Sequence, residues 1–492
     1  MRRLALLSAL TLAAAPALAD APPAHSDGQP NRYRLEIDAT ARRATVEASL
    51  WLSGNLLSMF NVAPVPGLPN GTADLIEGLE VEDADGALLP VESLGQGDFE
   101  LPRGGRVKVR YRVRLEHDRY AWPAGAEEVA YPTDEGWMAT GATLLLADGG
   151  DAIVGPIEVA VSLPAGWRAV TPWPAAASGA GFAPASRREL LSNALFFGTA
   201  ATERVAAGGV ELTLLLGRRY RGSAALFADL LRSQLATYRE LFGADPQARR
   251  FLVVVNEGAS GDGGAFASSF SQLIAGDADE ASRLIWGYTM AHELLHFWNG
   301  LSLVPADSRE EWFKEGATDY LTIATLARNG WIDEATARRR LENAVLRVLL
   351  ARRMQGLEMS VREAGERKQE HRLLVYGGGC LAAMALDVEL RRASGDRAGL
   401  PELVARLFAG HAQPGTRYAL ADIVRAAREV AGADVAPLLE RAVGSGEPFD
   451  IVPYLAGLGL RLDTFAEEVY IRPEARSAAA DRARFAAVFG KR

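Results

Sequence analysis

The chain has 492 residues, of which 49% are hydrophobic and 23% are charged, and its formal net charge is −9. This balance is typical of a folded globular protein and excludes a disordered or fibrous chain, and the length predicts two or three domains. An acidic chain is a poor match for a polyanion, so we expect no nucleic-acid partner.

The first 19 residues have the pattern of a secretory signal peptide. Arg2 and Arg3 precede an apolar run over residues 4–15, and a small-x-small cleavage site, Ala-Leu-Ala, follows at 17–19. The alternative, a retained anchor helix, would need a longer apolar run. We expect an exported protein without a membrane segment after cleavage. Because Cys380 is the only cysteine, no intrachain disulfide can form, which favours a bacterial periplasm over a disulfide-dense extracellular medium.

Residues 20–220 are predicted to form an N-terminal all-β domain. Short segments in which polar and apolar residues alternate recur in this part, for example at 106–111 and 210–214, and glycine and proline separate them. A period of two is typical of β-strands that bury one face. A segment of this length with many such strands predicts a β-sandwich.

A change to helical periodicity marks a second domain, which we place at 221–395. Its first predicted helix has leucines on one face, at Leu226, Leu230, Leu231 and Leu235. A strand at 251–255 and a glycine-rich loop follow, and the later part is almost wholly helical. Further amphipathic runs predict a helical C-terminal subdomain at 396–492. The predicted fold class is therefore α+β with several domains.

The strongest chemical signal is the sequence His292-Glu293-Leu294-Leu295-His296 inside a predicted helix over 284–298. The i, i+4 spacing places both imidazoles on one face of the helix, where they can bind one Zn²⁺. Glu293, next to the first histidine, can act as general base toward an attacking water. The pattern predicts a zinc site whose third ligand comes from elsewhere in the chain.

We expect the third ligand to be Glu315. It lies in a segment with helical spacing, and Ser308 and Glu311 have the pattern of a capping box at the start of that helix. Packed against the first helix, Glu315 would complete a His₂Glu site of the thermolysin type. Asp319, one turn later on the same face, is predicted to accept the free ring N–H of a histidine ligand. The alternative is a pair of core histidines and an ordinary surface carboxylate.

The segment 292–299, HELLHFWN, together with 312–320, WFKEGATDY, resembles the glycyl aminopeptidase family of zinc peptidases, within the gluzincins. The resemblance implies an N-terminal β domain, a thermolysin-like catalytic domain and a helical C-terminal region. It implies one Zn²⁺ per chain and a peptide or protein substrate. It also implies that Tyr376 faces the tetrahedral intermediate, where its hydroxyl would stabilise the oxyanion. Many relatives carry a C-terminal PDZ-like domain, and we expect it to be absent because no strand-rich stretch long enough for one follows Leu462.

One element of the family pattern is changed. Relatives have a Gly-Gly-x-Glu-His element whose glutamate binds the free amino terminus, whereas the matching segment here reads Gly-Gly-Ala-Phe-Ala. We expect this segment to line the substrate site through Gly263, Gly264, Ala265 and Phe266. Without the glutamate, an α-ammonium group would lose its charged partner, which predicts altered selection of the amino terminus. Glu257 or Asp262 in the neighbouring loop could replace it.

Together these residues predict an exported zinc metallopeptidase, with His292, His296 and Glu315 as ligands, Glu293 as base and Tyr376 at the oxyanion. An aminopeptidase with an unrecognised anchor and an endopeptidase both fit the sequence. So does a protein of another class, which keeps the zinc peptidase fold and binds a peptide or protein without turnover. The complete set of base, ligands and hydroxyl favours an enzyme.

Overall fold

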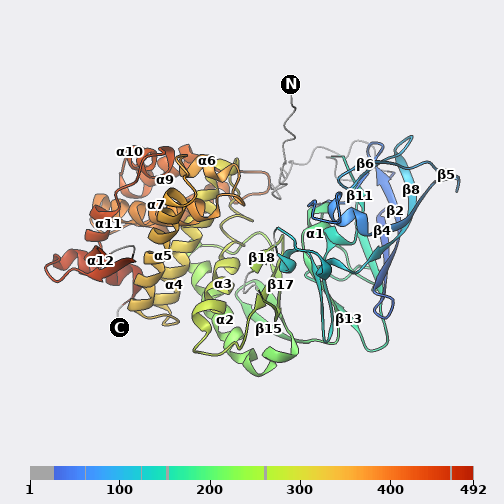
Figure 1. Ribbon diagram of the computed structural model, residues 1–492, viewed down its shortest axis with the longest axis horizontal. Helices are drawn as coiled ribbons and strands as arrows, with labels where there is room; N and C mark the ends of the chain where they lie inside the picture. The colour runs from blue at the N-terminus through green and yellow to red at the C-terminus, as the bar shows by residue number, and fades with distance from the viewer. Residues whose placement is uncertain are drawn as a thin grey trace.

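The computed structural model describes residues 27–60, 63–123, 125–150, 155–259, 263–465 and 468–490. The predicted signal peptide lies outside these ranges. Figure 1 shows three neighbouring parts: β-rich sheets at the N-terminal side, a central sheet with two helices, and a group of helices at the C-terminal side. This arrangement confirms the predicted α+β class with a β-rich N-terminal part and a helical C-terminal region.

The N-terminal part contains three sheets that share most of one apolar core. A six-stranded sheet has the order β12-β1-β2-β8-β4-β5. Side chains along β1 alternate strictly between buried and exposed, as the sequence predicts for a strand with one face on a core. The strands of this sheet are β1 (Asn31–Asp38), β2 (Arg43–Leu52), β4 (Ile76–Asp83), β5 (Leu88–Leu89), β8 (Gly105–Arg114) and β12 (Ile157–Ser162).

Two four-stranded sheets complete this part, with the orders β11-β3-β7-β6 and β13-β14-β10-β9. Their strands are β3 (Leu56–Ser58), β6 (Glu92–Gly95), β7 (Asp98–Glu100), β9 (Ala130–Thr133), β10 (Gly136–Thr140), β11 (Ala147–Asp148), β13 (Arg168–Val170) and β14 (Ala194–Gly198). Short helical turns connect them: η1 (Gly71–Leu75), η2 (His117–Arg119), η3 (Ala126–Glu128), η4 (Gly141–Thr143) and α1 (Arg187–Leu191).

The central sheet has five strands in the order β15-β16-β17-β19-β18. β16, β17 and β19 run parallel, and the short β18 lies antiparallel to β19 at the edge. Every residue of β19 is buried, as expected for a strand covered on both faces. The strands are β15 (Ala201–Ala207), β16 (Val210–Leu216), β17 (Arg250–Glu257), β18 (Gly263–Ala265) and β19 (Ser269–Ile274).

This sheet crosses the domain boundary that we predicted at residue 220. β15 and β16 precede that residue, yet β16 pairs with β17 along six residues. Alternation identifies a strand equally well in either sheet, and only the pairing partner decides which sheet it joins. Residues 201–216 therefore belong structurally with the central sheet.

Helices cover the central sheet and build the C-terminal part. α2 and α3 flank the sheet, and α4 to α12 follow (Figure 1). The bounds are η5 (Arg218–Ser223), α2 (Ala224–Phe242), α3 (Arg283–Leu295), η6 (Ser308–Glu310), η7 (Trp312–Ala317), α4 (Thr318–Arg328), α5 (Glu334–Arg353), α6 (Val361–Gly365), α7 (Arg372–Ser394), α8 (Leu400–His411), α9 (Leu420–Ala431), α10 (Ala436–Leu439), η8 (Glu440–Gly444), α11 (Val452–Ala456) and α12 (Ala479–Phe489).

One β-hairpin interrupts the helices of the C-terminal part. β20 (Leu460–Phe465) pairs antiparallel with β21 (Glu468–Pro473), inside the segment 396–492 that the sequence predicts to be a helical subdomain. The backbone N–H of Ile471 donates to the Glu342 carboxylate of α5 at 2.7 Å, which attaches the hairpin to the helices. The strands are short and contain few buried residues, so their apolar pattern was weak in the sequence.

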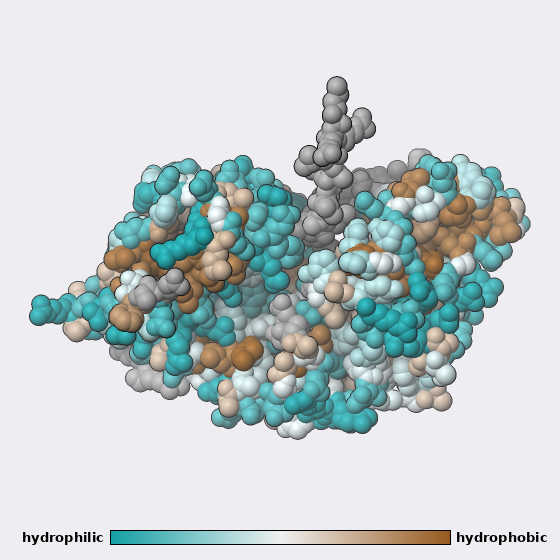
Figure 2. Space-filling model, viewed as in Figure 1, coloured by the Kyte–Doolittle hydropathy of each residue, from teal (hydrophilic) through white to brown (hydrophobic). Residues whose placement is uncertain are grey.

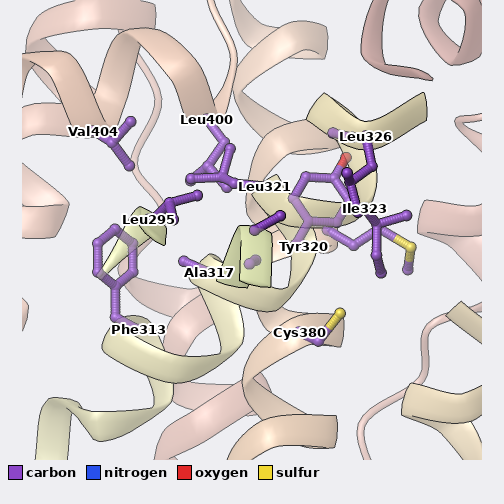
Figure 3. Close-up of a cluster of buried hydrophobic side chains, with 14 of the residues drawn as sticks. Leu295, Phe313, Ala317, Tyr320, Leu321, Ile323, Leu326, Cys380, Leu400 and Val404 are labelled. Atoms are coloured by element: carbon purple, nitrogen blue, oxygen red, sulfur yellow. The ribbon is translucent and has the colours of Figure 1, made fainter. Parts of the chain in front are cut away.

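Among the described residues, only α7 is long and apolar enough to cross a membrane by length and composition, and 83% of its apolar stretch is buried inside the protein. A helix that is hydrophobic on all sides and packed by neighbours is typical of a protein core. Figure 3 shows Cys380 of this helix close to Tyr320 and Ala317 in a cluster to which α8 adds Leu400 and Val404. α7 is therefore the central element of the helical core.

In the view of Figure 2, hydrophobic residues gather in separate groups at the two ends of the molecule, and hydrophilic residues surround them. Large exposed hydrophobic side chains are scattered over separate elements, for example Leu88 of β5, Met354 after α5 and Phe465 of β20. Such single exposed residues are ordinary for a globular protein.

Two glycines bring η7 and α7 into direct backbone contact. A Cβ atom on Gly316 would lie 2.1 Å from the carbonyl carbon of Gly379, and one on Gly379 would lie 2.4 Å from the carbonyl oxygen of Trp312. No side chain fits at either position, because both neighbours are backbone. This contact holds the turn that carries Glu315 beside the turn that follows Tyr376.

We predict that Gly379→Ala lowers the free energy of unfolding by about 1 to 3 kcal/mol, as overpacking of a close contact does. Gly410→Ala in α8 is the matched control, since an added Cβ there meets only the end of the Arg406 side chain, at 3.7 Å. Urea unfolding of both variants measures the difference. Equal free energies of unfolding for the two variants would show that η7 and α7 can move apart at this contact without loss of stability.

Candidate metal centre

The two histidines of the sequence motif lie on one side of the C-terminal end of α3, with His292 in its last turn and His296 at its C-cap. Trp286, Met290 and Leu294 form another, buried face of this helix, and the exposed fraction of His292 and of His296 is 5%. Their Nε2 atoms are 3.0 Å apart, as the i, i+4 spacing predicts.

Glu315 completes the group from η7. Its Oε2 lies 3.1 Å from Nε2 of His296 and 3.4 Å from Nε2 of His292. One ligand atom from each of these three residues lies within 4.8 Å of the other two, and all three residues are buried. Two imidazoles and one carboxylate are the donor set of a catalytic zinc site with a free coordination position. The residues therefore fit Zn²⁺.

Glu315 stands on a π-helical turn, which the sequence did not indicate. The predicted capping box at Ser308 is not formed: instead, the Asp307 carboxylate accepts a hydrogen bond from the N–H of Arg309 at 2.8 Å and caps the short η6. The chain then continues through η7 into α4. Single π turns occur often at functional sites, because the wider turn re-aims a side chain.

The side chain of Asn299 stabilises this unusual turn. Its Nδ2 lies 3.1 Å from the carbonyl oxygen of Phe313, 3.2 Å from that of Lys314 and 3.1 Å from Oγ1 of Thr318. The backbone carbonyl oxygen of the same residue lies 2.9 Å from Nδ1 of His296. One buried residue thus links a histidine ligand with the turn that carries the carboxylate ligand. Sequence reasoning missed this role, although Asn299 closes the HELLHFWN segment.

Asp319 lies beside the other histidine. Its Oδ1 is 3.0 Å from Nδ1 of His292, and it accepts hydrogen bonds from the Tyr288 hydroxyl at 2.7 Å and from Arg347 at 3.0 Å. A carboxylate in this position holds the ring with Nε2 toward the metal. Tyr288 and Arg347, neither of which a motif indicated, fix that carboxylate in turn.

The charges of the centre keep the carboxylate ligand ionised. Burial raises the pKa of Glu315, but the positive charges of Lys368, His296 and Lys314 outweigh burial and hold its pKa well below the usual range. Burial lowers the pKa of His292, whereas the carboxylates of Asp319 and Glu315 outweigh that effect and raise it to about 10. A cation at this centre is therefore strongly favoured by its surroundings.

Glu293 and Tyr376 lie next to the ligands. Glu293 follows His292 on α3 and contacts β18, since a Cβ atom on Gly263 would lie 3.5 Å from its Cγ. The ring of Tyr376 stacks on the ring of His292, with 6.0 Å between centroids. Burial raises the pKa of Tyr376 well above its ordinary value, so its hydroxyl stays protonated and can donate a hydrogen bond.

The glycine-rich segment reaches the site only in part. Gly263 and Gly264 lie in β18 close to Glu293 and Glu128, whereas Phe266 is 7% exposed and packs in an apolar cluster. That cluster joins the β-rich part to the central sheet and contains Tyr131, Met138 and Phe196. Contrary to our expectation, Phe266 faces this interface, because its apolar side chain finds a core there. A glutamate in its place would be buried among apolar groups and would not restore an amine anchor. Ala265 is partly buried against the helical core.

Glu128 of the β-rich part enters the site, and no sequence motif indicated it. It ends η3, and a Cβ atom on Gly264 would lie only 2.3 Å from its Cγ. Burial and the nearby negative charge of Glu293 raise the pKa of Glu128 to about 7. The carboxylate therefore stands beside both the glycine edge strand and Glu293.

Of the two loop carboxylates that the sequence offers as anchors, only Glu257 lies in the described part of the chain, and it points to the surface. Glu257 pairs with Arg219, and 56% of its side chain is exposed. Asp262 lies outside the described residues. Glu128 is thus the carboxylate that the β-rich part places against β18, beside Glu293 of α3.

Two family models match the sequence. The M61 glycyl aminopeptidase model matches residues 287–374, and the Peptidase M61 N-terminal domain model matches residues 33–196. Together they cover about half of the chain. The first range contains His292, Glu293, His296 and Glu315, and the second contains Glu128. The sequence has no significant match among curated proteins.

Solved structures share the fold. An aminopeptidase N family protein from Idiomarina loihiensis is 21% identical, with a TM-score of 0.75 over 88% of this chain and 79% of that chain. An M1 zinc metallopeptidase from Deinococcus radiodurans, a mutant bound to a Tyr-Ser-Ala substrate, is 15% identical, with a TM-score of 0.56 over 88% of this chain and 98% of that chain. At these identities the likeness concerns the fold.

We predict that Asn299→Ala weakens Zn²⁺ binding by about tenfold to a hundredfold, the usual effect of removing a group that orients metal ligands. Competition with a chelator of known affinity measures the change. Asn329→Ala is the control, because that exposed amide donates only to Thr237, at 2.9 Å. Equal zinc affinity in both variants would contradict the proposed link between the two parts of the site.

Proposed function

Because the chain belongs to the M61 glycyl aminopeptidase family and is a peptidase, we propose that it acts as a zinc-dependent aminopeptidase in which Glu128 binds the substrate's free amino terminus. The observation that carries this proposal is the carboxylate of Glu128, which lies against Gly264 and near Glu293. It occupies the neighbourhood in which the family's own amine-binding glutamate is missing.

His292, His296 and Glu315 would hold the zinc ion. Bound there, Zn²⁺ supplies a Lewis acid that polarises a carbonyl and lowers the pKa of water. The convergence of three buried ligand atoms supports this assignment, and so does the zinc metallopeptidase named among the structural neighbours.

Glu293 and Tyr376 would act on the reacting groups. Glu293 takes a proton from the attacking water and passes it to the departing amine of the cleaved bond. The hydroxyl of Tyr376 donates a hydrogen bond to the oxyanion that develops on the scissile carbonyl. Burial keeps this hydroxyl protonated over the whole working range of pH.

Glu128 would decide which bond is cleaved. An α-ammonium group that enters the site loses its hydration. A charge-assisted hydrogen bond with the Glu128 carboxylate offsets that loss. The carbonyl carbon of the first residue is two bonds from the α-nitrogen, so the first peptide bond then lies close to Glu293. A segment from the middle of a protein has no ammonium group to offer, which disfavours internal cleavage.

We also propose that the protein is exported to a bacterial periplasm. Support comes from the amino-acid pattern of residues 1–19 alone, with its basic start, apolar run and small-residue cleavage site. Peptides in that compartment would be its substrates.

Matched peptides with free and N-acetylated termini, analysed by mass spectrometry, test the proposal. We expect stepwise loss of N-terminal residues from the free peptides only, and Glu293→Gln should reduce the rate by about a hundredfold to ten-thousandfold, since it removes the general base. Internal cuts in both sets would instead identify an endopeptidase. Absence of any product that depends on Glu293, despite bound zinc, would identify a binding protein.

For Glu128→Gln we predict a fall in kcat/KM of about tenfold to a hundredfold for free peptides, since a hydrogen bond to a charged group contributes about 1.5 to 3 kcal/mol. Glu257→Gln should leave kcat/KM unchanged, because that side chain pairs with Arg219 at the surface. The comparison distinguishes the two candidate anchors directly.

The pH profile gives a second measurement on the same variants. The pKa of Glu128 is about 7, so below that pH the carboxyl binds a proton and loses its attraction for the ammonium group. The kcat/KM of the wild type should therefore fall as the pH drops through about 7, whereas the α-ammonium itself stays charged there. The kcat/KM of Glu128→Gln should not fall in this pH range. The same step in wild type and variant would contradict the role of Glu128.

A further inference from the structure

The two oxygens of the Glu315 carboxylate have different partners. Oε2 faces the histidine nitrogens, at 3.1 Å from His296 and 3.4 Å from His292. Oε1 faces two lysines, with Nζ of Lys368 at 2.9 Å and Nζ of Lys314 at 3.3 Å. One oxygen is thus directed to the metal position and the other to ammonium groups.

Lys368 is partly buried, and neighbouring carboxylates balance its charge. Only 13% of its side chain is exposed, and its Nζ also lies 3.1 Å from the Glu311 carboxylate. Lys314 lies 3.4 Å from the same carboxylate. The four side chains form a cluster with two positive and two negative charges. A buried ammonium group is tolerated only with such partners.

The two lysines differ in where they come from. Lys314 precedes Glu315 in the chain and 23% of its side chain is exposed. Lys368 comes from the turn before α7, the helix that also carries Tyr376, and it is more deeply buried and closer to Oε1. Its contact with Glu315 is therefore a tertiary contact between the element that carries the ligand and the element that carries the hydroxyl.

We propose that Lys368 is a positioning residue that keeps Glu315 a one-oxygen ligand of the metal. The inference rests on the proposed zinc site. A carboxylate with two free oxygens can turn and bind a metal through both. Oε1 of Glu315 can do so only by giving up a charge-assisted hydrogen bond with the partly buried ammonium group of Lys368. While Lys368 keeps Oε1 away from the metal, a coordination position stays open for water and substrate.

The test compares Lys368→Met with Arg367→Met, both loaded with zinc. Arg367 is the adjacent residue, 60% of its side chain is exposed, and it pairs with Glu370, so its loss removes the same charge without touching Glu315. X-ray absorption spectroscopy counts the ligand oxygens, and the visible spectrum of the Co²⁺ form reports four or five ligands. Assays give kcat and KM for a free peptide.

We expect one additional ligand oxygen and a weaker Co²⁺ absorption in Lys368→Met, with kcat about tenfold to a hundredfold lower and KM unchanged. Arg367→Met should match the wild type in every measurement. If Lys368→Met has the same ligand number, Co²⁺ spectrum and kcat as Arg367→Met, the inference is wrong while the zinc site stands. If the wild type binds no zinc, the proposed function fails together with the inference.

Circular dichroism of the metal-free variants shows whether each chain folds. Should Lys368→Met unfold, the double variant Glu311→Gln with Lys368→Met is used, because it leaves one lysine and one carboxylate in the cluster and so preserves its net charge. An additional ligand oxygen in the folded double variant supports the proposal, and an unchanged ligand number overturns it.

Discussion

The structure depends on one electrostatic requirement: a buried carboxylate, Glu315, must stand against two imidazoles with its charge intact. An ionised carboxyl group in the interior is unfavourable unless every oxygen has a partner. The lysines on Oε1 and the histidine nitrogens on Oε2 meet this requirement. The π turn of η7, the amide of Asn299 and the contact between Gly316 and Gly379 all serve to bring the carboxylate to that place.

The same site also requires two distant parts of the chain to meet. The ligands and Glu293 come from α3 and η7, Tyr376 comes from α7, and Glu128 comes from the β-rich part. An apolar cluster that contains Phe266 joins that part to the central sheet. Packing at this interface therefore sets where Glu128 lies relative to the metal centre, and with it the proposed selection of the amino terminus.

Each histidine of the candidate metal site is held by a different kind of acceptor. Asp319 faces His292 and is itself fixed by Tyr288 and Arg347, whereas a backbone carbonyl faces His296. A charged partner raises the electron density of one ring more than a neutral partner does for the other. The arrangement leaves little freedom for either ring, so the centre is organised by the protein's own contacts.

The amino-acid sequence by itself determined the class of fold and the candidate metal site with its neighbour Glu293, because these follow from local periodicity and from the spacing of His292, His296 and Glu315. Tertiary structure decided the rest. Residues 201–216 join the central sheet, and the Phe266 side chain packs in an apolar core. Glu128 enters the site through contacts between segments far apart in the chain. A pattern of residues along the chain describes which face of an element is apolar, but it carries no information about which distant element will cover that face.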